Sequence, residues 1–189
     1  MDTSGKEAPE VLASEDVWRG RVFSLSVDMV REEGREYRRE VVRHPGSGVI
    51  VPLYDDGTVA LVRQYRHPAV KYLLEIPAGS RDGFETPEAC AARELQEELG
   101  LVAARWEKLC EFFPSPGFCA EKMWLYLATE LSETKAGPED DELIEIVRLP
   151  LTRALDMIAA GEIEDAKTII GLTMTAARIN AYARRGFER

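Results

Sequence analysis

Three glutamates, Glu94, Glu97 and Glu98, lie within five consecutive residues of the chain. On a helix, residues three and four apart share one side, which would place these carboxylates with Cβ atoms roughly 5–6 Å apart. Like charges at this spacing repel one another, and Mg²⁺ relieves the repulsion because it prefers carboxylate oxygens as ligands. Arg93 could orient the carboxylates by pairing with Glu97 or with Glu85 in the preceding loop. By itself this spacing favours a solvated acidic helix face, because charge clusters are common on protein surfaces, and a metal-binding helix is the alternative.

A helix is expected to carry these glutamates from Thr86, which caps its first turn, to Leu99. Gly100 follows the last residue, where glycine commonly ends a helix. Ala92, Leu95 and Leu99 recur at helical spacing on another side. We expect that side to be buried against a sheet.

The rest of the chain predicts strands before and after this helix and two helices at the end. Strand order of this kind favours an α+β fold over a doubly wound parallel sheet. Residues 1 to about 15 show no periodicity and are expected to form a loose tail. The expected strands are 18–30, 35–43, 49–53, 58–65, 106–113, 122–130 and 143–149, and the expected final helices are 151–160 and 165–185.

Composition excludes several classes of protein. The 189 residues carry a formal charge of −10, which would repel a nucleic-acid backbone, and no Lys/Arg run offsets it. No apolar run approaches the roughly 20 residues of a membrane-spanning helix. The acidic start lacks the features of a signal peptide, and three dispersed cysteines do not form a disulfide framework. These features favour a cytoplasmic protein that binds neither nucleic acid nor membrane.

The glutamates belong to a longer pattern that resembles the Nudix box. Leu95 and Leu101 occupy the two apolar positions of the box. Its fixed positions are occupied by Gly79, Glu85, Arg93, Glu94, Glu97, Glu98 and Gly100. The sequence is therefore identified as a member of the Nudix hydrolases. That resemblance implies an α+β fold of mixed and antiparallel sheets sandwiched between helices. It also implies a Nudix domain at 46–189, preceded at 1–45 by a tail and an antiparallel strand extension.

From about residue 18 to residue 177 the sequence is similar to the ADP-ribose pyrophosphatase branch of this family. The similarity rests on five motifs in the expected order, at 38–46, 62–66, 75–79, 114–118 and 161–168. Two short segments depart from the branch. Residues 119–121 read Cys-Ala-Glu where Ser-Asp-Glu is usual, and residues 82–85 read Asp-Gly-Phe-Glu where a Pro-Gly-Glu turn is commoner.

The resemblance implies a magnesium site on the glutamate helix. Two or three Mg²⁺ ions, replaceable by Mn²⁺, would be held by the Ala78 carbonyl and by the carboxylates of Glu94, Glu97 and Glu98.

The resemblance also implies a catalytic base outside that helix. The base is expected in the acidic loop 137–142, at Glu142. The alternatives are Glu139 and Asp141 in the same loop and Glu145 in the strand that follows it.

Substrate contacts are implied in the same way. Arg66 is expected to bind diphosphate oxygens, which suit a bidentate guanidinium. Arg38 and Glu40 are expected near the adenine and its ribose. Independently of the resemblance, the aromatic ring of Phe23, or alternatively of Trp18, could stack on the adenine; the alternative is a place in the core or in a dimer interface. The proline loop would add Ser115 and Gly117.

The expected activity is Mg²⁺-dependent hydrolysis of ADP-ribose to AMP and ribose 5-phosphate. One alternative is another substrate of the same chemistry, such as a different sugar nucleotide, a dinucleoside polyphosphate or a coenzyme. A second alternative is a Nudix-fold sensor that binds a nucleotide without cleaving it. Members of this branch are usually homodimers whose N-terminal strands reach the partner, so the same is expected here.

Overall fold

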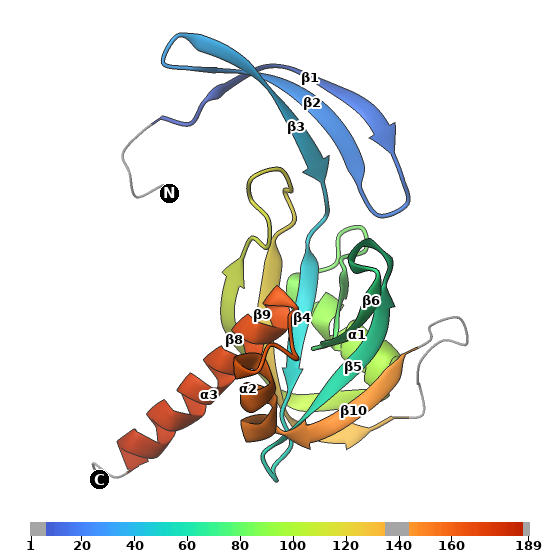
Figure 1. Ribbon diagram of the computed structural model, residues 1–189, viewed down its shortest axis with the longest axis vertical. Helices are drawn as coiled ribbons and strands as arrows, with labels where there is room; N and C mark the ends of the chain where they lie inside the picture. Colours follow the sequence, from blue (N-terminus) through green and yellow to red (C-terminus); the bar gives the residue numbers. More distant parts are fainter. Residues whose placement is uncertain (1–6, 135–143, 187–189) are drawn as a thin grey trace. The chain divides into compact units, whose positions relative to one another are not determined.

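The structure, a computed structural model, describes residues 7–134 and 144–186. The chain divides into two compact units, each visible in Figure 1. The N-terminal unit consists of Met1–Gly46 and Phe113–Lys122, and the main unit consists of Ser47–Phe112 and Met123–Arg189.

The N-terminal unit is built on an antiparallel sheet of β1 (Glu10–Arg19), β2 (Ser24–Glu32) and β3 (Arg35–Arg43). The expected loose tail is wrong from residue 10 onward, and the expected strand 18–30 is divided by a turn between β1 and β2. β1 escaped prediction because almost every residue in it is exposed, so its sequence lacks the alternation of a half-buried strand. It is held by backbone pairing with β2 and by a 2.6 Å hydrogen bond from Ser14 to Asp28.

The main unit contains two sheets. The first is mixed, with strand order β7-β4-β9-β8, and only its β4–β9 pair is parallel. Its strands are β4 (Ser47–Pro52), β7 (Ala78–Ser80), β8 (Leu101–Phe112) and β9 (Met123–Glu133). The second is antiparallel, with order β10-β5-β6, and a 3₁₀ turn (His67–Ala69) joins β5 to β6. Its strands are β5 (Thr58–Arg66), β6 (Lys71–Glu75) and β10 (Glu145–Pro150).

Helices pack on the sheets of the main unit in two apolar cores. Along β4, Val49 and Val51 point into a core shared with α2 (Leu151–Ala159) and α3 (Ala166–Gly186). Ile50, on the opposite side of the same strand, points into a core shared with α1 (Pro87–Leu99). The alternation of strand side chains thus serves two helical layers. This arrangement confirms the expected α+β fold of mixed and antiparallel sheets between helices.

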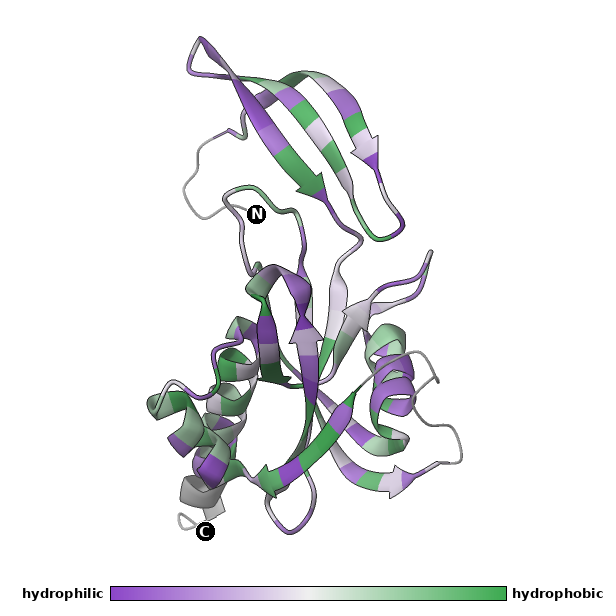
Figure 2. Ribbon diagram, turned by 45° about the vertical axis from the view of Figure 1, so that its right-hand side comes forward, coloured by the Kyte–Doolittle hydropathy of each residue, from purple (hydrophilic) through white to green (hydrophobic). Residues whose placement is uncertain are grey.

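Element boundaries follow the sequence closely where local signals are strong. α1 follows its expected cap and ends at the expected residue, and the ends of α2 and α3 differ from the expected ones by one residue at most. β8 begins five residues earlier than expected, directly after α1. Figure 2 shows hydrophobic and hydrophilic residues interspersed along the strands and helices. Among the described helices, none is both long and apolar enough to cross a membrane.

Candidate active site

The position of α1 is fixed by its two ends. The Oγ1 atom of Thr86 accepts a hydrogen bond from the backbone N–H of Ala89 at 3.2 Å and so satisfies one donor of the first turn. Gly100 adopts the left-handed conformation (φ 64°) and donates its N–H to the carbonyl of Gln96 at 2.9 Å. These caps define which turns of the helix present the glutamates.

A close approach of α1 to β4 aims one side of the helix at the sheet. A Cβ atom at Gly48 would lie 2.7 Å from the backbone nitrogen of Ala91, so only glycine leaves room for the helix there. Ala91, Leu95 and Leu99 are buried in this contact. The expectation that Ala92 is buried was wrong: it is exposed, because the buried side is populated at four-residue rather than three-residue spacing.

Glu94 and Glu98 are buried, with only 9% and 6% of their surface exposed. The carboxylate of Glu94 lies directly against the backbone of β7. A Cβ atom at Gly79 would be 1.9 Å from Oε1 of Glu94 and 2.0 Å from its Cδ. Glycine at position 79 therefore leaves the space that this carboxylate occupies. Two buried carboxylates one helical turn apart require positive charge close by.

Arg93 supplies part of that positive charge and ties the helix to the loop before it. Its Nη1 atom lies 2.6 Å from Oε1 of Glu94 and 2.8 Å from Oε2 of Glu97. Nε and Nη2 donate to the two oxygens of Glu85 at 3.2 and 3.1 Å, and Nη2 also reaches the carbonyl of Ser80 at 3.0 Å. Both partners considered from the sequence, Glu85 and Glu97, are thus engaged. The hydrogen bonds to Glu85, followed by the charge of Glu94, raise the pKa of Arg93.

Glu85 is the anchor of the loop between β7 and α1. Hydrogen bonds from Arg93 lower its pKa, and the backbone N–H of Asp82 donates to its Oε2 at 3.2 Å. Nε of Arg81 donates to the Glu85 carbonyl at 2.9 Å, and the backbone N–H of Glu85 bonds to the Asp82 carbonyl at 2.9 Å. The Asp-Gly-Phe-Glu departure at 82–85 therefore still forms a closed turn that presents Glu85 to Arg93.

Cys90 lies beneath this loop and is fully buried. Its thiol donates to the carbonyl of Gly79 at 3.3 Å. Burial raises the pKa of Cys90 to about 11, so the thiol stays protonated near neutral pH and acts as a donor. Within the described residues all three cysteines are free.

Arg66, expected to bind diphosphate, lies at the end of β5 and is engaged by Glu75 at the end of β6. Its Nε and Nη2 atoms each donate to a Glu75 oxygen at 2.8 Å. These hydrogen bonds raise the pKa of Arg66, burial opposes them, and the charges of Glu75, Glu98 and Asp165 add to the rise. The field of Glu98 on Arg66 indicates that β5 and α1 bring their charged side chains to the same region of the main unit.

The other expected substrate residues lie in the N-terminal unit. Phe23 packs against Trp18, with ring centroids 5.1 Å apart, and remains partly exposed. Arg38 and Glu40 lie on β3 and are exposed, and the carbonyl of Ser115 accepts the backbone N–H of Cys119 at 3.0 Å.

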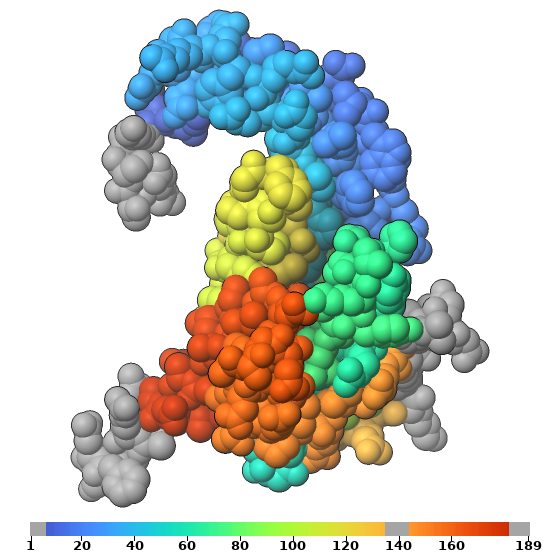
Figure 3. Space-filling view, in the orientation of Figure 1, coloured from blue at the N-terminus to red at the C-terminus, as the bar shows by residue number. Residues whose placement is uncertain are grey.

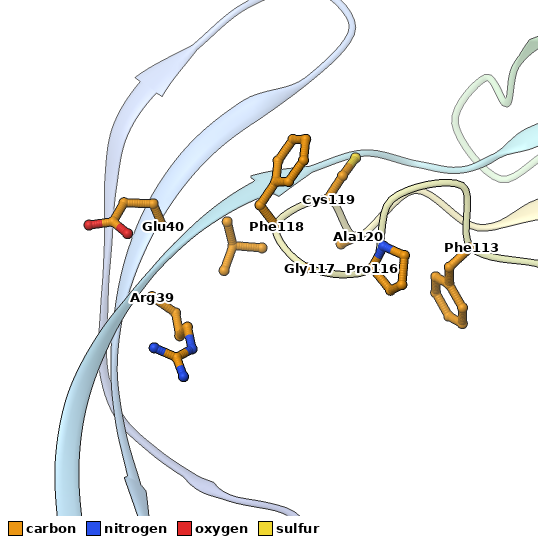
Figure 4. A pocket seen from close by; sticks show the side chains of 9 residues that line it. Arg39, Glu40, Phe113, Pro116, Gly117, Phe118, Cys119 and Ala120 are labelled. Carbon is orange, nitrogen blue, oxygen red and sulfur yellow. The ribbon is translucent and has the colours of Figure 1, made fainter.

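Within the N-terminal unit, β3 and the loop 113–120 enclose a pocket of about 440 Å³ (Figure 4). Glu40 and Gly117 line it, and Figure 4 shows the side chains of Arg39 and Glu40 pointing in different directions from β3. The loop is joined to β3 by hydrogen bonds from Val42 N–H to the Phe118 carbonyl (2.8 Å) and from Ala120 N–H to the Val42 carbonyl (2.9 Å). Of the five expected substrate residues in this unit, the pocket therefore gathers two.

The expected catalytic base lies outside the described residues, and the described residues do not form a preformed metal cluster. Glu142, with its alternatives Glu139 and Asp141, lies outside the described residues, whereas Glu145 is described on β10 and lies 3.2 Å from Nε of Arg63. In the described part of the chain, no three His, Cys, Asp or Glu side chains form a ready metal site. The guanidinium of Arg93 lies among the carboxylates instead.

Sequence reasoning assigned no role to two buried residues near Arg66. Glu75 and Lys167 stand in motifs similar to the ADP-ribose pyrophosphatases, at the end of β6 and at the start of α3, and form an ion pair across 92 positions of sequence. A lysine on the buried side of a helix start was the available signal, because lysine is seldom buried without a partner.

Comparisons with known proteins agree with this architecture. The chain is 38% identical over 162 residues to an ADP-ribose pyrophosphatase of Bacillus subtilis (strain 168), and the match covers 84% of this chain and 88% of that protein. It is 39% identical over 166 residues to a protein of Bacillus methanolicus named methanol dehydrogenase activator, covering 86% and 90%. A solved structure described as an ADP compounds hydrolase is similar with a TM-score of 0.79 and 25% identity, covering 94% of this chain and 97% of that one.

The match to the family itself covers both the box and the strands that position it. Residues 43–170 match the NUDIX domain family, a range that includes α1, Arg66 and the start of α3. The resemblance inferred from Gly79 to Gly100 is thereby confirmed. This chain belongs to the NUDIX domain family.

Proposed function

We propose that the protein is a Mg²⁺-dependent pyrophosphohydrolase that cleaves ADP-ribose to AMP and ribose 5-phosphate. The observation that carries the proposal is the buried pair of Glu94 and Glu98 on α1, held against Gly79 and beside Arg93. A relative named ADP-ribose pyrophosphatase, similar over most of both chains, supports the substrate. The solved structure named as an ADP compounds hydrolase supports the ADP moiety.

The donor set fits a hard divalent cation. Buried carboxylates offer the oxygen ligands that Mg²⁺ prefers, and Gly79 leaves the space in which the Glu94 carboxylate lies. In this proposal Glu94 and Glu98 hold two or three Mg²⁺ ions, or Mn²⁺ in their place, together with Glu97 and the Ala78 carbonyl. When bound, the ions would neutralise charge on the diphosphate and lower the pKa of coordinated water.

The chain's own residues then orient the substrate and handle the proton. Arg93 keeps the carboxylates of Glu94 and Glu97 in place through its hydrogen bonds. Arg66 binds oxygens of the diphosphate, which a guanidinium suits. Glu142 accepts the proton of the water that attacks phosphorus, because carboxylates occupied by cations are poor proton acceptors.

The N-terminal unit recognises the adenosine half in this proposal. Phe23 stacks on the adenine, Arg38 and Glu40 lie near the base and its ribose, and the loop with Ser115 and Gly117 contributes further contacts. The strands of residues 1–45 also form the contact of a homodimer, and residues 46–189 carry the chemistry. The proposed location is the cytoplasm, where reducing conditions keep the free thiols reduced.

The test is a substrate panel measured with Mg²⁺ at a fixed pH. ADP-ribose, a GDP-sugar, a dinucleoside polyphosphate, a coenzyme with a diphosphate, and dATP are each incubated with the protein. Chromatography identifies the nucleotide product, and a coupled phosphatase counts the phosphate released. We expect ADP-ribose to have the highest kcat/KM and to yield AMP and ribose 5-phosphate in equal amounts.

Other outcomes of this panel would reject the proposal. Equal or faster cleavage of dATP would indicate a nucleoside triphosphatase, and a clear preference for the GDP-sugar or the coenzyme would change the substrate while keeping the chemistry. Binding of ADP-ribose without turnover, measured by calorimetry, would indicate a sensor.

Reaction in ¹⁸O-labelled water would show which phosphorus is attacked, since the label enters the product that contains the attacked phosphorus.

A further inference from the structure

A buried ionic cluster lies where the start of α3 meets the ends of β5 and β6. The side chain of Glu75 is 1% exposed and that of Lys167 is 8% exposed. Glu75 forms ion pairs with Lys167 and Arg66, and Lys167 also lies 3.2 Å from Asp165. In the space-filling view the orange to red-orange segment that leads into α3 lies against the green segment of β5 and β6 (Figure 3).

The first turn of α3 is fixed to β6, which fixes Lys167 relative to Glu75. Asp165 accepts hydrogen bonds from the backbone N–H of Thr168 at 2.9 Å and from its hydroxyl at 2.5 Å. The same Thr168 oxygen accepts the backbone N–H of Ile76 at 2.9 Å. Thr168 is fully buried, so these bonds are shielded from water. The backbone that carries Lys167 is therefore held in place by these hydrogen bonds.

The charges of the cluster balance in pairs. Arg66 and Lys167 contribute two positive charges, and Glu75 and Asp165 contribute two negative ones. Without Lys167, the carboxylates of Glu75 and Asp165 would have only the guanidinium of Arg66 as a positive partner. A larger part of the positive charge of Arg66 would then be neutralised by these two carboxylates. A buried carboxylate that loses a partner also draws the remaining cation toward itself.

Arg66 is the most exposed member of the cluster. Its side chain is 39% exposed, although Nε and Nη2 are both committed to Glu75. Nη1 makes no hydrogen bond to any residue that the structure describes. The bidentate pair fixes the plane of the guanidinium, and so it fixes where Nη1 points.

We propose that Lys167 is a positioning residue: by neutralising Glu75 and Asp165, it holds Arg66 with Nη1 available for the substrate's diphosphate. The proposal rests on the proposed function for the identity of that substrate. Lys167 touches no reacting atom in this account. Its effect on the reaction passes entirely through Glu75 to Arg66.

The kinetic test is a double-mutant cycle between Lys167→Met and Arg66→Ala, assayed on ADP-ribose with Mg²⁺. Methionine approximates the length of lysine and suits a buried site but carries no charge. We expect Lys167→Met to lower kcat/KM by about 10- to 100-fold, the usual effect of losing a group that orients a ligand-binding residue. In the Arg66→Ala background the same change should cost less than about 2-fold, because nothing remains to be positioned.

Lys108→Met is the matched control. Lys108 lies on β8 and pairs with Glu111, but its side chain is 49% exposed and it contacts neither Glu75 nor Arg66 in any described interaction. Its replacement should leave kcat/KM within about 2-fold of the wild type. Equal losses from Lys167→Met in both Arg66 backgrounds would overturn the proposal, since a purely structural lysine would act independently of Arg66.

A second measurement does not depend on the substrate. The Nε–H signal of Arg66 in a ¹H–¹⁵N spectrum, assigned by its loss in Arg66→Ala, reports the Glu75 pair directly. We expect this signal to shift and to exchange faster with water in Lys167→Met, and to be restored by Lys167→Arg. An unchanged signal would reject the positioning role even if ADP-ribose is hydrolysed. A changed signal with no ADP-ribose turnover would reject the proposed substrate and retain the positioning of Arg66.

If Lys167→Met does not fold, Glu75→Gln tests the same path. The amide keeps the shape of Glu75 but loses the charge that binds both cations. We expect Glu75→Gln to lower kcat/KM and to make any additional Arg66→Ala effect smaller than in the wild type. Full additivity of the two changes would contradict a path through Glu75.

Discussion

Replacing Gly79 by alanine should separate the activity of this protein from its stability. A Cβ atom at this position would lie 1.9 Å from Oε1 of Glu94 and 2.3 Å from Oε2, where carbon and oxygen atoms in contact are normally well over 3 Å apart. The carboxylate would have to move by about 1–1.5 Å to restore ordinary contact. It is the far end of a flexible side chain, so it can move without displacing the backbone.

The cost to folding should therefore be small and the cost to activity large. A forced rotamer and a weakened bond between Arg93 and Glu94 together amount to about 1–2 kcal/mol. For a chain of this size that lowers Tm by about 2–8 °C. A misplacement of about 1 Å at a catalytic constellation costs about 100-fold in rate. We expect Gly79→Ala to lower kcat/KM on ADP-ribose by this factor and to require more Mg²⁺ for half-maximal activity.

Gly57→Ala is the matched control. Gly57 lies in the turn before β5 with φ +79°, and a Cβ atom there meets no atom within 4 Å. Alanine in this conformation costs about 1–2 kcal/mol through backbone strain alone. The two variants should thus have similar Tm values, measured by scanning calorimetry, but only Gly79→Ala should lose activity. Equal activities in the two variants would refute the assignment of Glu94 to the reacting centre.

Four further experiments test other parts of the account. Glu98→Gln should lower activity by at least about 100-fold with a Tm close to the wild type, as an Mg²⁺ titration and calorimetry would show; near-full turnover would contradict its role as a metal ligand. Glu142→Gln should lower kcat by about 10²–10⁴-fold and leave KM nearly unchanged, and a collapse of activity at a neighbouring carboxylate instead would reassign the base. Burial raises the pKa of Glu75, but Arg66 and Lys167 outweigh burial and lower this pKa below 4.5. The stabilisation that ionised Glu75 contributes is therefore complete above pH 4.5 and is lost as the pH falls further. Urea unfolding between about pH 5.5 and 3.5 should show a shallower loss of unfolding free energy in Glu75→Gln than in the wild type. The buried thiol of Cys90, with a pKa of about 11, should react with iodoacetamide at about pH 8 only on unfolding, as peptide mass spectrometry would detect.

Local signals made α1 and its charged residues predictable. Thr86 as a cap and Gly100 as the last-turn glycine act within a few residues of the helix, so the sequence alone contains the physical cause of its limits. The same holds for the pairing of Arg93 with Glu97, which follows from four-residue spacing. The choice of Ala91 rather than Ala92 for the buried side could not be read in this way. It depends on the angle at which the helix meets Gly48, a residue about forty positions earlier.

The strand β1 was missed for a related reason. Periodicity predicts a strand when one of its sides is buried, and β1 has no such side. Its residues are ordered by backbone bonds to β2, which any sequence of suitable conformation can form. An alternating sequence pattern reflects the burial of one side of a strand, so a strand that is exposed on both sides is hard to predict from its sequence.

The residue type of Arg66 predicts a possible ligand but does not predict which of its nitrogens are available. The match of a guanidinium to phosphate predicts a diphosphate ligand from the residue type, and that expectation treats all edges of the guanidinium as available. In the fold, two of its nitrogens are bound to Glu75, and Glu75 is bound by a lysine 92 positions away. In the proposed role of Arg66, the diphosphate would therefore contact the edge of the guanidinium that Glu75 leaves exposed. In this proposal the role of Arg66 depends on the ion pair between Lys167, at the start of α3, and Glu75, at the end of β6, as well as on the box that identifies the family. A loss of Arg66 function from a change at Lys167, with the helix α1 untouched, is the measurement in which that dependence would be visible.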